Sequence, residues 1–343
     1  RCKKPMILST PIIISGMAYG LALSKEAKLA LAKASAMAGT ATNTGEGFWL
    51  PEERDLAANL IIQYNRGSWS KDPDILRQAD MIEIQLGQGA IAGISHYTPA
   101  SKVPSHLLPK LKLEKHMDLI TKSYHQEFLQ PDGFAKLVDR LRQITGGVPI
   151  GIKMAFTNTI EQDIDIAAEA GVDVLALEGT TAATKGAPPI IEDDFGLPTI
   201  MGLCRAVNHL EKRGLKDQIS LIVSGGFFNP GDMLKALALG ADAVYIGSIA
   251  LFAMSHTQSF EALPFEPPTQ IVWETGKYRR RFKWKKGAVS LAKFITSCTL
   301  EIAEGVRALG KTSIDQVDRS DLIALDETTA AIAGIPTAWH RKS

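Results

Sequence analysis

Leu221-Ile222-Val223-Ser224-Gly225-Gly226 begins the stretch of sequence that decides the fold, and Val244-Tyr245-Ile246-Gly247-Ser248 ends it. Between these two apolar runs, Asn229-Pro230 can open a helix, because a proline in the first turn lacks only an N–H that is unpaired there, and Gly240 can close it. A strand, a helix and a second strand in this order form one unit of a parallel sheet. The glycines after each strand predict two tight turns at one edge of that sheet.

The same rhythm extends over most of the chain. Short runs rich in isoleucine and valine alternate with longer stretches of helical periodicity, which is typical of a parallel sheet covered by helices. Eight such units predict an α/β protein whose main body is a closed (β/α)8 TIM barrel. The predicted strands are residues 11–15, 40–44, 60–65, 81–86, 148–155, 172–178, 219–226 and 243–248.

Two segments interrupt the rhythm. Residues 87–130 are too long for an ordinary connection between a strand and a helix, so they predict a lid or binding loop. The chain after about residue 257 contains several prolines, a basic stretch and two predicted helices. We therefore expect a barrel at residues 1–256 and a C-terminal helical extension at residues 257–343 that packs on it.

Composition narrows the class of protein. The 343 residues are 45% hydrophobic and 22% charged, which suits a large buried core and excludes disordered and disulfide-stapled chains. A net charge of +1 creates no field that attracts nucleic acid or a membrane surface, and no apolar run approaches a membrane span. Cys2, Cys204 and Cys298 match no metal-binding spacing, so we expect no metal and a reducing, cytoplasmic compartment. The chain starts at Arg1 rather than methionine, so a membrane anchor upstream stays open.

The turns after the last two strands predict a phosphate site. In barrel enzymes this edge binds phosphate through loop N–H groups and the N-terminus of a short helix. Ser224, Gly225, Gly226, Gly247 and Ser248 occupy the two expected positions. The alternative is that these glycines only form tight turns.

Lys153 is a second candidate, in the fifth predicted strand. Alternation turns Ile150 and Ile152 toward the helix layer and Lys153 into the barrel. A buried ammonium needs a negative partner, which is either an anionic ligand or developing charge on one. The structural alternative is an ion pair with Glu178, one strand over.

Other polar side chains follow the second and fourth strands. Asn43 and Glu46 come after one, and Gln85 ends the other. Each alone is more often a hydrogen-bonded strand end than a catalyst, but their convergence at one rim favours a site.

Residues 87–93 imitate a dinucleotide fingerprint with incorrect spacing and no helix after it, so we reject that interpretation. The basic, aromatic stretch at residues 277–286 could bind nucleic acid or lipid, and we favour a solvated face with buried rings.

These residues resemble a known family. The matching segments are Ile14-Ser15-Gly16-Met17-Ala18-Tyr19-Gly20, Asn43-Thr44-Gly45-Glu46-Gly47, and Ile82-Glu83-Ile84 with Gln88-Gly89-Ala90. They resemble the FMN-binding synthase domain of glutamate synthase, over roughly residues 11–255. The resemblance implies a barrel in which reduced FMN gives hydride to 2-iminoglutarate, formed from 2-oxoglutarate and ammonia.

The resemblance also implies roles for single residues. Ser15, Gly16 and Met17 would lie along the flavin, with Asn43 near its ring. Lys153 matches a family lysine that offsets negative charge on the reduced ring. Glu46 matches a glutamate on the substrate side, and the glycine turns of the last two strands would hold the FMN phosphate, through Ser224, Gly225, Gly226, Gly247 and Ser248.

Several positions depart from the family pattern. Residues 251–276 contain no cysteine, so we expect no iron–sulfur cluster. Gln85 stands where the family has lysine, and Glu178 stands where a small residue is usual. The family's His-Asp-Gly-Gly becomes Thr180-Thr181-Ala182-Ala183, with Lys185 added. The substrate pocket is therefore altered, and we also expect no glutaminase domain.

The leading hypothesis is an FMN-dependent oxidoreductase of the glutamate synthase type, acting on the CH–NH2 group of an amino acid or on the matching imino acid. Lys153 would tune the flavin, Glu46 and Gln85 would orient the substrate, and residues 87–130 would close over it. One alternative is a flavin-free lyase or isomerase that uses Lys153 on a phosphorylated substrate. Another is a subunit that binds FMN without catalysis. The partner is a small amino or oxo acid, and the substrate's identity, the electron donor and the oligomeric state, a homo-oligomer included, stay open.

Overall fold

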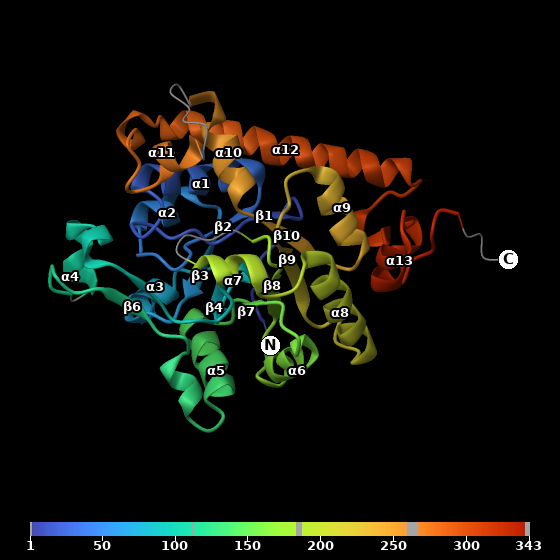
Figure 1. The fold of residues 1–343 in the computed structure, drawn as a ribbon, viewed down its shortest axis with the longest axis horizontal. Coiled ribbons are helices and arrows are strands. Elements are labelled where there is room, and N and C mark those ends of the chain that lie inside the picture. The colour runs from blue at the N-terminus through green and yellow to red at the C-terminus, as the bar shows by residue number, and fades with distance from the viewer. Residues whose placement is uncertain (1, 112, 183–186, 259–266, 340–343) are drawn as a thin grey trace.

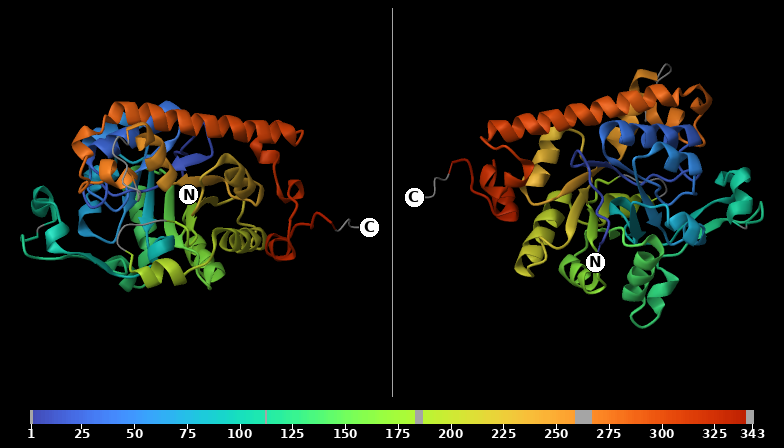
Figure 2. Two further views of the ribbon diagram at one scale, coloured as in Figure 1. Left: turned by 45° about the horizontal axis from the view of Figure 1, so that its top comes forward. Right: turned by 180° about the vertical axis from the view of Figure 1, so that it is seen from behind.

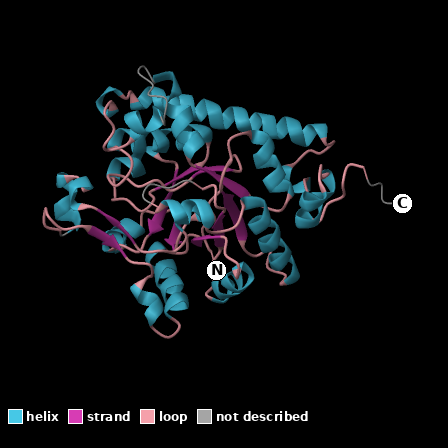
Figure 3. Ribbon diagram, in the orientation of Figure 1, coloured by secondary structure: helices cyan, strands magenta, loops and turns pink. Residues whose placement is uncertain are grey.

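The barrel strands appear where the sequence predicts them. The computed structural model describes residues 2–111, 113–182, 187–258 and 267–339 (Figure 1). Parallel strands surround a central axis and helices cover them from outside (Figure 3). Their order is β1-β10-β9-β8-β7-β4-β3-β2. The strands are β1 (Ile12–Ile14), β2 (Ala41–Asn43), β3 (Asn59–Tyr64), β4 (Met81–Gln85), β7 (Ile150–Ala155), β8 (Val174–Glu178), β9 (Ser220–Ser224) and β10 (Ala243–Ile246).

Strand β1 joins the two ends of the chain's strand series and nearly closes the barrel. Strand β1 pairs with β10, with Ile12 opposite Val244. At the remaining seam β1 lies beside β2, and the hydroxyl of Thr40 donates to the carbonyl of Ile12 at 2.5 Å. The nearly closed eight-stranded barrel and its C-terminal helix confirm the predicted fold.

Strand alternation produces two apolar layers. Ile150 and Ile152 belong to the large core between the strands and the helices. A smaller cluster fills the barrel interior and includes Ile13, Ile61 and Tyr245. Because side chains alternate along a strand, Lys153 falls on the interior face as predicted.

Local capping signals set the main helices. Ser24 accepts a hydrogen bond from the N–H of Ala27, and Gly39 ends the same helix at φ +67°. Asn229 caps the helix before β10. The helices are α1 (Lys25–Ala38), α2 (Pro51–Leu56), α3 (Pro73–Leu76), α4 (Leu108–Leu111), α5 (Gly133–Thr145), α6 (Ile160–Glu169), α7 (Pro189–Asp194), α8 (Thr199–Lys212), α9 (Pro230–Ala238), α10 (Ser248–Ser255), α11 (Pro267–Val272), α12 (Trp284–Ala308) and α13 (Glu327–Ala333).

The C-terminal part of the chain covers one side of the barrel. Helix α12 packs along α1 and also contacts α9 and α10, as both views in Figure 2 show. Its buried face includes Leu291, Ile295 and Ile302. The domain boundary at residue 256 stays a prediction.

The long segment after β4 projects from the barrel as an arm. It contains the antiparallel strands β5 (His96–Thr98) and β6 (Leu119–Thr121), with α4 between them (Figure 1). It returns to the barrel at Glu127, which accepts hydrogen bonds from Tyr64 and, at 3.1 Å, from Lys71. The arm is tied to the barrel at its base, and its role as a lid stays a prediction.

The basic stretch at residues 277–286 has exposed cations over packed aromatic rings, as the sequence predicted. Phe282 is buried, and Tyr278 and Trp284 pack against the main core. The ammonium groups of Lys283 and Lys285 belong to exposed residues. Within the described part of the chain, no helix has the length and apolar character needed to cross a membrane.

Candidate active site

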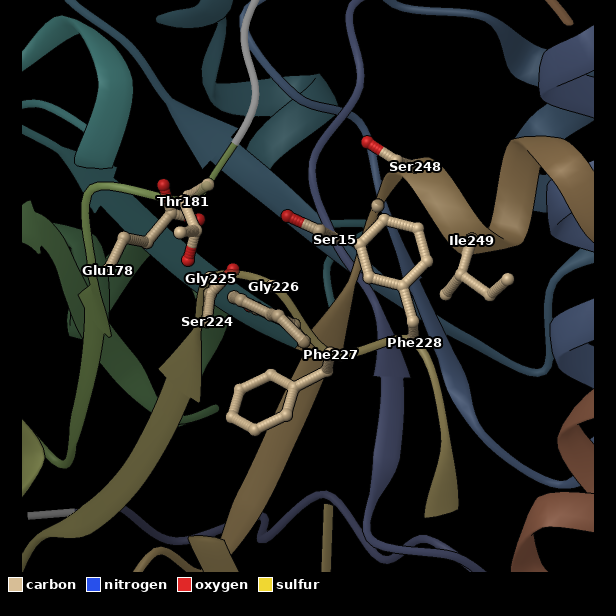
Figure 4. Close-up of a pocket in the computed structure, with 13 residues that line it drawn as sticks. Ser15, Glu178, Thr181, Ser224, Gly225, Gly226, Phe227, Phe228, Ser248 and Ile249 are labelled. Carbon is tan, nitrogen blue, oxygen red and sulfur yellow. The ribbon is translucent and has the colours of Figure 1, made fainter. Parts of the chain in front are cut away.

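A pocket opens at the C-terminal edge of the last barrel strands. The space inside it, including open solvent at its mouth, is about 410 Å³. Ser15 stands between Thr181 and Ser248, and two phenylalanines lie below (Figure 4). The lining residues are Ser15, Glu178, Thr181, Ala182, Ser224, Gly225, Gly226, Phe227, Phe228, Tyr245, Gly247, Ser248 and Ile249.

The glycine turns form one wall of this pocket. Gly225 and Gly226 have φ values of +119° and +80°, which side chains rarely tolerate. Gly247 directly precedes α10, whose first N–H groups have no partner within the helix. A Cβ at Gly247 would meet no atom of the described residues within 4 Å. Backbone donors, open space and a helix N-terminus suit an anion such as phosphate.

The segments predicted to lie along the ring contact each other. A Cβ on Gly16 would stand 2.8 Å from Oδ1 of Asn43. The same oxygen accepts a hydrogen bond from the N–H of Gly45 at 2.8 Å. A Cβ on Gly45 would stand 2.6 Å from the backbone nitrogen of Met17. The turn after β1 and the turn after β2 are therefore packed backbone to backbone.

Lys28 holds these two turns together, although it was not among the predicted site residues. Its ammonium, on α1, donates to the carbonyls of Met17 at 2.9 Å and Asn43 at 2.8 Å. It also pairs with Glu53 at 2.9 Å, and both side chains are fully buried. The signal was present, because Lys28 lies one turn before Leu31 on the apolar face of α1.

Lys153 lies inside the barrel, as the alternation predicted, but it already has a carboxylate partner. Its side chain is 1% exposed and its Nζ is 2.9 Å from Oε1 of Glu178. The ammonium also lies 3.5 Å from the hydroxyl of Ser15 and 5.5 Å from the ring centroid of Tyr245. The ion pair that we set as the structural alternative is thus present, at the pocket.

A second carboxylate lies deeper in the barrel. Glu83 accepts hydrogen bonds from Asn43 and Gln63 at 2.8 Å and from Tyr245 at 2.7 Å. Burial alone lowers the pKa of Lys153, but Glu178 and Glu83 raise it above its ordinary value. Lys153 therefore stays protonated, and the two carboxylates leave the barrel interior without a net positive charge.

The rim of β2, β3 and β4 brings together the predicted substrate-side residues. Burial raises the pKa of Glu46 to about 7, against the lowering effects of Arg66, Lys153 and a hydrogen bond with Gln85. Gln85 is buried, and its Oε1 has no hydrogen-bond partner among the described residues. The side chains of Glu46 and Gln85 converge as predicted.

Arg66 and His125 also belong to this rim and were missed. Arg66, 5% exposed, donates to the carbonyls of Gly93 and Ile94 in the arm. His125 is buried, contacts the carbonyl of Gln85 at 2.8 Å, and has its pKa lowered to about 4 mainly by burial. Arg66 was detectable as a basic residue just after the third strand, whereas nothing local marked His125.

Residues 87–93 and 183–185 were also singled out in the sequence. The segment with the imitation fingerprint forms only a short 3-10 turn, Gly89–Ile91, and no helix. Ala183 and Lys185 lie outside the described residues. Within the ranges that the structure describes, no three histidine, cysteine or acidic side chains group in a way that could hold a metal ion.

Sequence comparisons identify related proteins. A family model described as a conserved region in glutamate synthase matches residues 1–312, which confirms the resemblance. A glutamate synthase large subunit-like protein of Rhizobium meliloti is 32% identical, over 98% of this chain and 80% of its own length. The archaeal glutamate synthases (NADPH) of Archaeoglobus fulgidus and Methanocaldococcus jannaschii are 34% and 31% identical, over 73% and 96% of this chain. The chain spans 49% and 66% of those two proteins.

Solved structures share the fold. A flavocytochrome b2 mutant with pyruvate bound has a TM-score of 0.58 and 22% identity, over 94% of this chain and 71% of that chain. A mandelate oxidase mutant with a monooxide FMN adduct has a TM-score of 0.55 and 17% identity, over 90% of this chain and 77% of that chain. At these identities the likeness supports the barrel alone.

Proposed function

Because this chain belongs to the glutamate synthase family, we propose that it is an FMN-dependent oxidoreductase acting on the CH–NH2 group of an amino acid or on the matching imino acid. One observation carries the proposal. A pocket with a glycine-rich anion cradle on one wall has Glu178 on another, and Glu178 pairs with the buried ammonium of Lys153 behind it. A phosphate-bearing cofactor with an electron-accepting ring matches both walls.

The residues present fit FMN. A Cβ at Gly247 would meet no atom in the part of the chain that the structure describes, which leaves room for a phosphate beside the N–H groups of Gly225, Gly226 and Ser248. Ser15 lines the same pocket, and Gly16, Met17 and Asn43 adjoin it to hold the ring. When bound, FMN supplies two-electron redox chemistry that no side chain can provide.

The rim residues handle the substrate and its proton. A carboxyl whose pKa is about 7 exchanges a proton readily at neutral pH, so Glu46 serves as the general acid or base. Gln85, whose buried Oε1 is unpaired within the described part of the chain, accepts a hydrogen bond from a substrate N–H. Arg66 holds the backbone of the arm against this rim, and the arm excludes water when substrate is bound.

A lyase or isomerase that uses Lys153 as a nucleophile is the weaker alternative. A nucleophilic lysine needs a lowered pKa, whereas Glu178 and Glu83 hold that of Lys153 above its ordinary value despite burial. A subunit that binds FMN without catalysis would share the cradle. Such a subunit would not need Glu46 beside Gln85 as a group that exchanges protons. The presence of Glu46 there therefore favours a catalytic function.

We also propose that electrons do not enter through an iron–sulfur cluster, because residues 251–276 contain no cysteine. The donor then meets the flavin directly. Iron analysis of the purified protein tests this, and stoichiometric iron would contradict it.

A visible absorption spectrum tests the proposed function. We expect protein that is mixed with FMN and then separated from unbound FMN to keep the flavin absorption band. One of a panel of amino acids should bleach this band under anaerobic conditions. Lys153→Ala should retain FMN and slow the bleaching. Protein that stays colourless after reconstitution would overturn the proposal. A bound flavin that stays oxidised with every amino acid and with every donor other than dithionite would favour the non-catalytic subunit.

A further inference from the structure

Glu178 joins three parts of the site. It ends strand β8, is 4% exposed and lines the pocket (Figure 4). Its Oε1 is 2.9 Å from the ammonium of Lys153. Its Oε2 accepts a hydrogen bond from the backbone N–H of Gly89 at 3.1 Å, in the first turn of the arm. One carboxylate therefore contacts the buried cation and the base of the arm.

The charge of Glu178 matters more at this position than its shape. Glu83 is already satisfied by three neutral donors from Asn43, Gln63 and Tyr245. Glu178 is the carboxylate that pairs directly with Lys153. A buried carboxylate at 2.9 Å cancels most of the field that the ammonium would exert on a neighbouring ring.

We propose that Glu178 lowers the reduction potential of FMN bound in this pocket by cancelling the charge of Lys153, and that its contact with Gly89 ties this effect to the arm. The inference rests on the proposed function. Two-electron reduction places negative charge on a flavin ring, so an uncompensated Lys153 would favour the reduced form. With Glu178 present, the site favours reduction less and gives up electrons to an acceptor more readily.

The backbone contact between β8 and the arm does not depend on this charge. A Cβ on Gly89 would stand only 1.9 Å from the carbonyl oxygen of Gly179, and the N–H of Ala90 donates to the carbonyl of Ala182 at 3.2 Å. The arm is thus seated on the segment after β8 by close backbone packing. Glutamine at position 178 can accept the same hydrogen bond from Gly89, so Glu178→Gln removes the charge and keeps the geometry.

The test is the midpoint potential of FMN-loaded protein, measured by reductive titration against a reference dye. We expect Glu178→Gln to raise the ratio of the dissociation constants of oxidised and reduced FMN on the order of tenfold, which is about 30 mV for a two-electron couple. Lys153→Met should shift the potential in the opposite direction. The matched control is Glu161→Gln, which removes the carboxylate of the ion pair with Arg205 at the surface and should leave the potential unchanged.

A second comparison covers the case in which Glu178→Gln does not fold. Glu178→Leu should raise the potential in the same direction, because it removes the same negative charge beside Lys153 with an apolar side chain. A potential unchanged or lowered by removal of the Glu178 charge overturns this inference alone. Wild-type protein that takes up no FMN overturns the proposed function, and the inference with it.

Discussion

Replacing Glu46 by glutamine tests the electrostatics of the rim without any need for substrate. Burial raises the pKa of Glu46 from its ordinary 4.5 to about 7. The folded chain therefore binds this proton more tightly than the unfolded chain. Each pH unit between the two values is worth about 1.4 kcal/mol, so the effect sums to about 3 kcal/mol.

The sign follows from proton linkage. Between pH 4.5 and pH 7 the folded state holds a proton at Glu46 that the unfolded state has released, so the free energy of unfolding falls as pH rises. Below pH 4.5 both states are protonated, and above pH 7 the loss is complete. Glutamine does not titrate. Relative to wild type, Glu46→Gln should gain about 3 kcal/mol across this window.

Urea unfolding from pH 4.5 to pH 8 measures the difference between the two proteins, in which contributions from other titrating groups cancel. Glu192→Gln, on the exposed surface of α7, is the control and should follow wild type. Arg66→Met should move the fall to higher pH, because Arg66 opposes the rise in the pKa of Glu46. A wild-type minus Glu46→Gln difference that does not vary with pH would refute the reasoning.

Three further predictions use the same protein. Lys28→Met should cost about 3–5 kcal/mol in urea unfolding, because it leaves Glu53 buried and unpaired, and Lys28→Met/Glu53→Leu should recover most of that loss. Gly247→Ala should unfold like wild type, since its Cβ meets no atom of the described ranges within 4 Å. It should nevertheless raise the Kd for FMN at least about tenfold, because the methyl group enters the anion cradle; equal affinity would exclude the cradle. The pKa of His125, lowered to about 4 mainly by burial, predicts stability that is lost as pH falls from 6.5 to 4, by about 3 kcal/mol. His125→Phe should lose this acid-side dependence in urea unfolding, and its persistence would contradict the assignment.

Local patterns predicted the scaffold because they act over a few residues. Apolar runs bounded by glycine predicted the barrel strands, and alternation within one strand predicted that Lys153 faces inward. Ser24 and Asn229 mark helix starts through hydrogen bonds to backbone N–H groups three residues on. Such interactions depend on neighbours in sequence, so a sequence is sufficient to identify them.

The rim could be predicted only in part. Asn43, Glu46 and Gln85 were found because the ends of parallel strands meet at one edge of a barrel. The partner of Lys153 was not decided, since an anion and Glu178 both satisfied the same requirement. His125 was missed because a long arm, whose path no local signal sets, brings it to Gln85.

Sequence by itself determined the strand and helix order, the inward direction of Lys153 and the family to which the chain belongs. The tertiary structure decided which charges meet: Lys153 with Glu178, and Lys28 with Glu53. The energy of a charge depends on distance and burial. Those quantities exist only after barrel closure brings segments far apart in sequence within a few ångströms of each other.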